Sequence, residues 1–282
     1  MRYSLLSRFK GTLFGAAIAA RDPKSTQDLE WAVLGIESLI SCGKLDLEHW
    51  ADSIGVANQS RDSVFSSSTA VIVSLPIMLF FHEDELTLGK KLHQAAQFWQ
   101  QPPETTMGML AIGYAIAQAL KEKLPHPNLI PQVCNYLATT ASDSADFRQQ
   151  LAQVQRLLVE PIGLERTINQ LCPKTNSSNA NIALAFYFFL SMPEDFRLCL
   201  GRIKQQIGID SSLGVVVGAL SGAYNGSAGI PVVQQRTIAD SQKLKFLAEN
   251  LLAVWSGANL TNRAEWGESL AIAAPRVIQP RS

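Results

Sequence analysis

The stretch Ile207–Pro231, IGIDSSLGVVVGALSGAYNGSAGIP, carries glycines four residues apart at Gly214, Gly218 and Gly222. Residues at this spacing share one face of an α-helix. A face made of glycines is almost flat, so the backbone of another helix can approach it closely. Each glycine destabilises a helix interior by roughly 0.5–1 kcal/mol relative to alanine. We therefore expect a buried central helix whose close packing compensates for this cost.

A second face of small residues lies near the start of the chain. The segment Leu5–Ala20 is rich in small and apolar residues and is predicted to form a helix. On it, Gly11, Gly15 and Ala19 recur every four residues and so share a face. We expect this face to pack against the glycine face of Ile207–Pro231.

A polar turn, Asp210-Ser211-Ser212, precedes the glycine-rich helix. Asp and Ser are ordinary N-cap residues, which accept hydrogen bonds from the first backbone N–H groups of a helix. Such an N-terminus is also a natural place for an anion or a polar ligand. From these residues alone, a plain cap and a ligand site both remain open.

Most of the remaining chain follows the helical period. Between residues 29 and 40, apolar residues recur at i, i+3, i+4 and i+7. No stretch alternates as a β-strand does, so the sequence predicts an all-α fold. The further predicted helices span residues 29–40, 46–54, 69–81, 85–98, 105–124, 129–140, 146–158, 182–190, 193–206 and 240–256.

Polar or proline-containing joints separate these helices. Residues 21–27 contain Pro23 and are predicted to be a loop in which Thr26 caps the next helix. Residues 55–68 and 172–181 are also predicted loops. Because the helices on either side of 172–181 are strongly apolar, we expect one domain over residues 1–282, with a loose tail after about residue 266.

The composition favours a large hydrophobic core and does not point to a highly charged binding partner. Of the 282 residues, 47% are hydrophobic and 17% are charged, and the formal net charge is zero. Nothing in this balance favours nucleic acid or an anionic membrane as a partner. The longest apolar runs, 70–81 and 182–190, are too short to span a bilayer. Four widely spaced cysteines and the charges of Arg8 and Lys10 near the N-terminus predict a cytoplasmic protein without a secretory signal.

Common catalytic motifs are absent from the sequence. It has no P-loop, no H-E-x-x-H and no nucleophile elbow. The four histidines are scattered, so none is singled out as a general base.

Several segments, taken in order, match the motifs of a known family. They are Arg8–Ala20 (RFKGTLFGAAIAA), Thr26–Leu39 (TQDLEWAVLGIESL), Ser66–Ile77 (SSSTAVIVSLPI), Ala183–Phe196 (ALAFYFFLSMPEDF) and Ile207–Pro231. Their order resembles that of the ADP-ribosylglycohydrolases, which include the dinitrogenase reductase-activating glycohydrolase. The resemblance runs from about Arg8 to about Trp255. It implies the all-α fold of that family and an activity that cleaves glycosidic bonds to ADP-ribose.

The resemblance also implies a metal site, and the sequence departs from the family there. Family members hold two divalent cations with Thr-Asp-Asp before the second helix and Asp-x-Asp-Thr before the glycine-rich helix. Here the first triplet is Thr26-Gln27-Asp28, in which an amide replaces one carboxylate. In the second segment, Ile209 and Ser211 stand in place of both ligand aspartates.

Other polar positions of the family differ as well. Its Gly-Asn-Gly loop corresponds to Ser67-Ser68-Thr69. Hard cations need several oxygen ligands, mostly carboxylates. We therefore expect that the pair of cations is lost and that no cofactor is bound.

The favoured interpretation is a degenerate family member, a pseudoenzyme that acts as a binding or regulatory module. The ligand would be ADP-ribose or a similar nucleotide, or the partner would be another protein. The expected remnant of the cleft comprises Thr26, Asp28, Asp210, Ser211 and Ser212.

Two other interpretations remain open. The chain could be an active ADP-ribosyl hydrolase with one Mg²⁺ or Mn²⁺, held by Thr26, Asp28, Asp210 and Ser212. It could instead be a structural partner that docks through exposed aromatic residues. Candidate patches for docking surround Trp99 and Phe80-Phe81, although ordinary core aromatics explain the same residues more simply.

Overall fold

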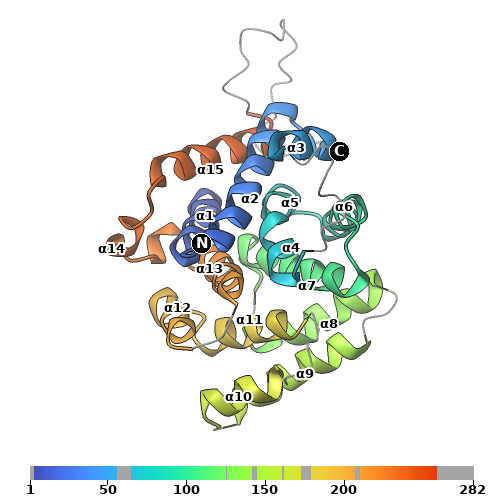
Figure 1. Cartoon of the computed structure of the whole chain (residues 1–282), viewed down its shortest axis with the longest axis vertical. Coiled ribbons are helices and arrows are strands. Elements are labelled where there is room, and N and C mark those ends of the chain that lie inside the picture. The colour runs from blue at the N-terminus through green and yellow to red at the C-terminus, as the bar shows by residue number, and fades with distance from the viewer. Residues whose placement is uncertain are drawn as a thin grey trace, which may run out of the picture.

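The fold is built on the contact between the two helices with small-residue faces. In the computed structural model these are α1 (Leu5–Ala19) and α13 (Ser211–Asn225), which lie side by side (Figure 1). A Cβ atom at Gly15 would overlap the carbonyl oxygen of Gly218 and lie 2.7 Å from its carbonyl carbon. A Cβ atom at Gly222 would likewise lie 2.6 Å from the carbonyl carbon of Gly11. The two backbones therefore touch.

The register of this contact is antiparallel. Gly11 meets Gly222, Gly15 meets Gly218, and the Cβ atom of Ala19 lies 3.9 Å from the position that a Cβ atom at Gly214 would occupy. The predicted packing of one small-residue face on the other is confirmed.

The structure describes residues 3–55, 65–124, 126–141, 145–160, 162–172, 179–206 and 210–258. Within these ranges the regular elements are helices and no β-strand occurs, which confirms the predicted all-α fold. None of the helices there is both long enough and apolar enough to cross a membrane. The other elements are α2 (Pro23–Cys42), α3 (Leu47–Ile54), α4 (Ser67–Val73), α5 (Leu75–Phe80), α6 (Glu85–Phe98), α7 (Pro103–Leu120), η1 (His126–Asn128), α8 (Leu129–Thr140), α9 (Ala145–Val159), α10 (Leu164–Leu171), α11 (Ala180–Ser191), α12 (Phe196–Lys204), η2 (Ser227–Gly229), α14 (Val232–Gln235) and α15 (Ser241–Trp255).

The core lies around α13. Helices α1, α4, α7, α11 and α12 all contact α13, and α15 covers the other side of α1 (Figure 1). Helix α7 is buried along its whole length after Glu104, and α11 is buried from Ala180 to Phe189 apart from Asn181. The predicted docking aromatics belong to this core, because Trp99, Phe80 and Phe81 are all buried. They are not surface patches.

The start of α2 differs from the prediction. The helix begins at Pro23, so most of the predicted loop 21–27 is helical and Thr26 lies in the first turn rather than at the cap. Asp22 is the N-cap, and it forms a capping box with Ser25. Proline is favoured in the first turn of a helix, because the N–H groups there have no intrahelical acceptor and proline has no N–H to leave unpaired. The apolar segment 69–81, in which Pro76 is expected to kink the helix or mark a first turn, is divided at Ser74, and Pro76 lies in the first turn of α5.

His82 is a buried histidine beside α15. Its side chain is 3% exposed and its ring lies between Phe9 and Trp255, with centroid distances of 5.6 and 4.9 Å. Its Nδ1 donates a hydrogen bond to the Leu79 carbonyl at 2.8 Å. Burial lowers the pKa of His82 to about 4. The ring is therefore neutral in the folded protein at neutral pH.

We expect His82 to make the protein less stable in mild acid. The unfolded chain binds a proton at His82 below about pH 6.5, whereas the folded chain does so only near pH 4. The contribution of neutral His82 to the free energy of unfolding is thus complete above pH 6.5 and is lost as the pH falls toward 4. About 2 kcal/mol of it is lost by pH 5. Urea unfolding at pH 7 and pH 5 should show a smaller pH effect in His82→Phe than in the wild type. If the free energy of unfolding fell equally in both proteins between pH 7 and pH 5, His82 would not be the group responsible.

Candidate functional site

The N-terminal ends of α2, α4 and α13 meet on one side of the core. All three helices are in mutual contact. Asp28 lies in the second turn of α2, Thr69 in the first turn of α4, and Ser212 in the first turn of α13. The meeting point is therefore lined by side chains from segments far apart in the sequence.

A buried carboxylate joins the three helices. Oδ2 of Asp28 accepts hydrogen bonds from Oγ1 of Thr69 at 2.9 Å and from Oγ of Ser212 at 3.1 Å. None of these three side chains, the Asp28 cluster, is more than 4% exposed. Burial raises the pKa of the Asp28 carboxyl above its ordinary value, and the two hydroxyl hydrogen bonds oppose this shift. The cluster is a closed polar contact inside the core.

The outer edge of the Asp28 cluster is formed by the caps of α2 and α13. Asp210 caps α13 through a 3.1 Å hydrogen bond from the Ser212 N–H, and its Oδ1 lies 3.9 Å from Lys24 Nζ. Hydrogen bonds from Ser211 and then Ser25 lower the pKa of Asp22, the cap of α2, to about 2. Asp210 is thus the N-cap of α13, as its position before the glycine-rich helix predicts.

Thr26 does not join the cluster. Two residues along a helix correspond to about 200° of rotation, so Thr26 and Asp28 point to opposite sides of α2. Thr26 is exposed and lines a separate cavity, and Gln27 is exposed as well. Of the predicted remnant, the structure brings together Asp28, Ser212, Asp210 and Ser211 but not Thr26. Ile209 lies outside the described residues.

The Ser-rich segment at the start of α4 places three buried hydroxyls near this region, of which one contacts Asp28. Thr69 is a direct partner of Asp28. The hydroxyls of Ser67 and Ser68 are buried in α4, and neither has a hydrogen-bond partner among the described residues. The available signal was their position in the segment that resembles the Gly-Asn-Gly loop.

The donor set does not fit a pair of divalent cations. Hard cations need oxygen atoms that accept, and most such sites use several carboxylates. The Asp28 cluster has one carboxylate, and the two hydroxyls beside it donate to that carboxylate. Over the described ranges, no three His, Cys, Asp or Glu side chains are grouped as a metal would require. The single-cation set is not assembled either, because Thr26 faces away from the cluster.

Three basic side chains lie at the start of α2 and the end of α12. Arg21 precedes α2, Lys24 lies in its first turn, and Lys204 ends α12, and all three are exposed. Partial burial, and then the positive charge of Arg21, lower the pKa of the Lys204 amine. Arg21 therefore acts electrostatically on Lys204, and we call these two side chains and Lys24, whose Nζ lies 3.9 Å from Asp210, the cationic rim.

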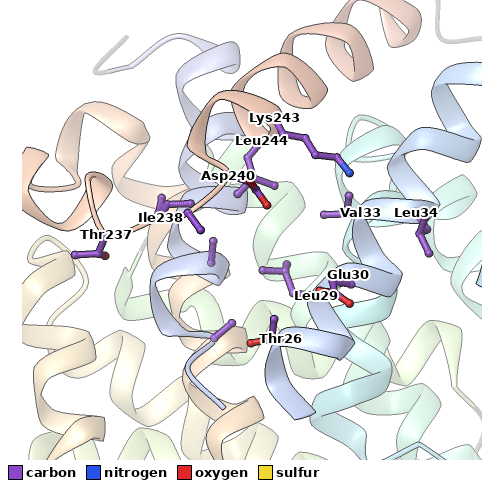
Figure 2. Close-up of a pocket in the computed structure, with 13 residues that line it drawn as sticks. Thr26, Leu29, Glu30, Val33, Leu34, Thr237, Ile238, Asp240, Lys243 and Leu244 are labelled. Atoms are coloured by element: carbon purple, nitrogen blue, oxygen red, sulfur yellow. The ribbon is translucent and has the colours of Figure 1, made fainter. Parts of the chain in front are cut away.

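A cavity of about 530 Å³ lies on the other side of α2, between α1, α2 and the start of α15 (Figure 2). Its walls are mainly apolar and include Leu29, Val33 and Leu244. Glu30 and Asp240 add carboxylates from two different elements. A volume of this size suits a small molecule.

Comparisons with known proteins agree with this fold. The sequence model of the family described as ADP-ribosylglycohydrolase matches residues 19–260. A search of the curated proteins finds no match. Among solved structures, a chain of an "ADP-ribosylglycohydrolase-related protein complex" is similar, with a TM-score of 0.64 and 17% sequence identity. The similarity covers 89% of this chain and 97% of that chain, and at this identity it supports the fold alone.

Proposed function

Because the chain belongs to the ADP-ribosylglycohydrolase family, we propose that it is a member that binds ADP-ribosyl groups without hydrolysing them. The observation that carries this proposal is the hydrogen bonding of the Asp28 carboxylate. Its Oδ2 accepts hydrogen bonds from the Thr69 and Ser212 hydroxyls, so it is engaged in holding three helices together.

Hydroxyl donors take over a structural task that cations perform in a two-metal site. A divalent cation draws carboxylates from several helices together. In this chain two O–H groups draw one carboxylate toward α4 and α13. The neighbouring helices stay joined, while the charge needed to activate a water molecule is not supplied.

The cationic rim favours a diphosphate as part of the ligand. Arg and Lys are the side chains that recognise phosphate oxygens, Arg in a bidentate manner and Lys as a point charge. Asp22 and Asp210 already accept from backbone N–H groups at the starts of α2 and α13. We therefore expect Arg21, Lys24 and Lys204, rather than the backbone, to bind the phosphates.

Calorimetric titration of chelator-treated protein with ADP-ribose tests the binding. We expect metal-independent binding that weakens about 10-fold in the double variant Arg21→Ala Lys24→Ala, since two exposed charged contacts contribute up to about 1 kcal/mol each and about 1.4 kcal/mol corresponds to a factor of ten. Lys44→Ala, an exposed lysine beyond the far end of α2, is the matched control and should leave affinity unchanged. Absence of binding without metal would refute the proposal.

A second titration, with Mn²⁺, separates this function from catalysis. We expect no hydrolysis of ADP-ribosylated protein with or without Mn²⁺. Hydrolysis that requires Mn²⁺ and disappears in Asp28→Asn would establish the alternative, an active hydrolase with a reduced metal site.

A further inference from the structure

We propose that the cavity between α2 and α15 binds a small organic cation with an apolar body. This inference is independent of the proposed function, because the cavity and the Asp28 cluster lie on opposite sides of α2. It rests on three properties of the cavity, namely its size, its apolar walls and the sign of its charge.

The apolar walls come from three parts of the chain. Ala17 closes the cavity from α1, and Leu29 and Val33 close it from α2. Ile238 belongs to the segment before α15, and Leu244 lies in the first turn of α15. A volume of about 530 Å³ lies inside the range of roughly 300–1,000 Å³ found for small-molecule sites. Desolvation of an apolar body against these side chains would supply most of the affinity.

Two carboxylates give the cavity its charge. Figure 2 shows Asp240 and Lys243 extending from the start of α15 toward α2, which carries Glu30. Lys243 is already paired, because its Nζ lies 2.9 Å from Oε1 of Glu37. Glu30 and Asp240 make no ion pair with any residue in the described ranges. The unbalanced charge of the lining is therefore negative.

The Asp240 side chain is oriented toward the cavity, where it can bind a cation. It occupies the N-cap position of α15, yet its side chain makes no capping hydrogen bond there. An N-cap aspartate ordinarily accepts from the N–H groups of the first turn. In Figure 2 its carboxylate is directed into the space between α15 and α2. The carboxylate is consequently available to an incoming ammonium group.

The cavity should accordingly discriminate by charge. An ammonium on an apolar body would meet Glu30 and Asp240 with its charge and Leu29, Val33 and Leu244 with its body. A carboxylate on the same body would be repelled. A neutral molecule of the same size would gain only the apolar contribution.

NMR titration of the full chain with benzylammonium, benzyl alcohol and benzoate tests this order. We expect benzylammonium to bind at least 10-fold more tightly than benzyl alcohol, and benzoate not to bind. Shifted resonances should include those of Val33 and Leu244. Equal affinity for the three probes, tighter binding of benzoate, or no binding of benzylammonium up to millimolar concentration would overturn the proposal.

Two variants connect the effect to the named carboxylates. Glu30→Gln Asp240→Asn retains the shapes of both side chains and should reduce benzylammonium affinity to that of benzyl alcohol. Asp52→Asn, an exposed residue on α3 that does not line the cavity, should leave it unchanged. The thermal unfolding midpoint of each variant confirms that it is folded. Unchanged benzylammonium binding in a folded double variant would overturn the proposal.

Discussion

Gly222→Ala is expected to prevent stable folding. The added Cβ atom would overlap the carbonyl oxygen of Gly11 and lie 2.6 Å from the carbonyl carbon of Gly11 and 3.2 Å from the backbone nitrogen of Thr12. These are backbone atoms of α1, so no side chain can rotate away and the two helices must separate. Ordinary overpacking costs about 1–3 kcal/mol. A forced separation along the central contact should cost more, at least about 4 kcal/mol, which is a large part of the stability of a typical domain.

A matched control lies on the same helix. Gly214→Ala would place its Cβ atom 3.9 Å from Ala19 and 4.0 Å from Ile203, which is ordinary contact. Because alanine favours the helix, this variant should be more stable than the wild type by roughly 0.5–1 kcal/mol. Urea unfolding monitored by circular dichroism measures both variants. Similar stability of Gly222→Ala and Gly214→Ala would contradict the backbone contact between α1 and α13.

Arg8→Met is expected to cost about 3–5 kcal/mol, the range for breaking a buried charged network. Nη1 of Arg8 donates to the carbonyls of Ala119, Ala223 and Tyr224 at 2.9, 3.1 and 2.8 Å. These carbonyls belong to the last turns of α7 and α13, where the regular helical hydrogen bonds run out, although the Ala119 carbonyl also accepts from the Glu122 N–H at 3.2 Å. Methionine fills a similar volume but leaves the carbonyls without this donor.

The positive charge of Arg8 also stabilises the folded protein. It lies at the negative ends of two helix dipoles, and its Nη2 is 3.2 Å from Oε1 of Glu122. Lys10→Met on the same helix is the control, since the Lys10–Glu249 pair, whose glutamate is 42% exposed, is expected to contribute at most about 1 kcal/mol. Chemical unfolding of both variants at pH 7 gives the comparison. A smaller loss in Arg8→Met than in Lys10→Met would refute the role assigned to Arg8.

The central packing of the fold could be predicted from the sequence. Glycine at every fourth position has a specific geometric meaning, because it leaves a flat strip along a helix. The sequence has two such strips, on α1 and α13, and from them we predicted that these helices are in contact. The structure confirms this contact. The boundaries of most long helices followed from apolar periodicity in the same way.

Short elements and helix starts were less predictable. Pro23 was interpreted as part of a loop, but a proline in the first turn is compatible with a helix that Asp22 caps. The eight-residue α10 and the four-residue α14 were missed, since so few turns give little periodic signal.

The site could be predicted only in part. The sequence placed Asp28 and Ser212 in one remnant, and the structure joins them by a hydrogen bond. It also included Thr26, which the phase of α2 turns to the opposite side. Thr69 was not assigned to the site, although it lies in the segment that resembles the Gly-Asn-Gly loop, because its contact with Asp28 depends on the tertiary packing of α4 on α2.

The pairing of α1 with α13 also affects how the chain is made. The first helix emerges early from the ribosome, but its partner ends only at Asn225. At a synthesis rate of about 5–20 residues per second, roughly 10–40 s separate the two events. During this interval the face of α1 that carries Gly11 and Gly15 lacks the helix that it packs against in the finished protein. The time that the nascent chain spends incomplete, rather than its final stability, should therefore set its demand for chaperones.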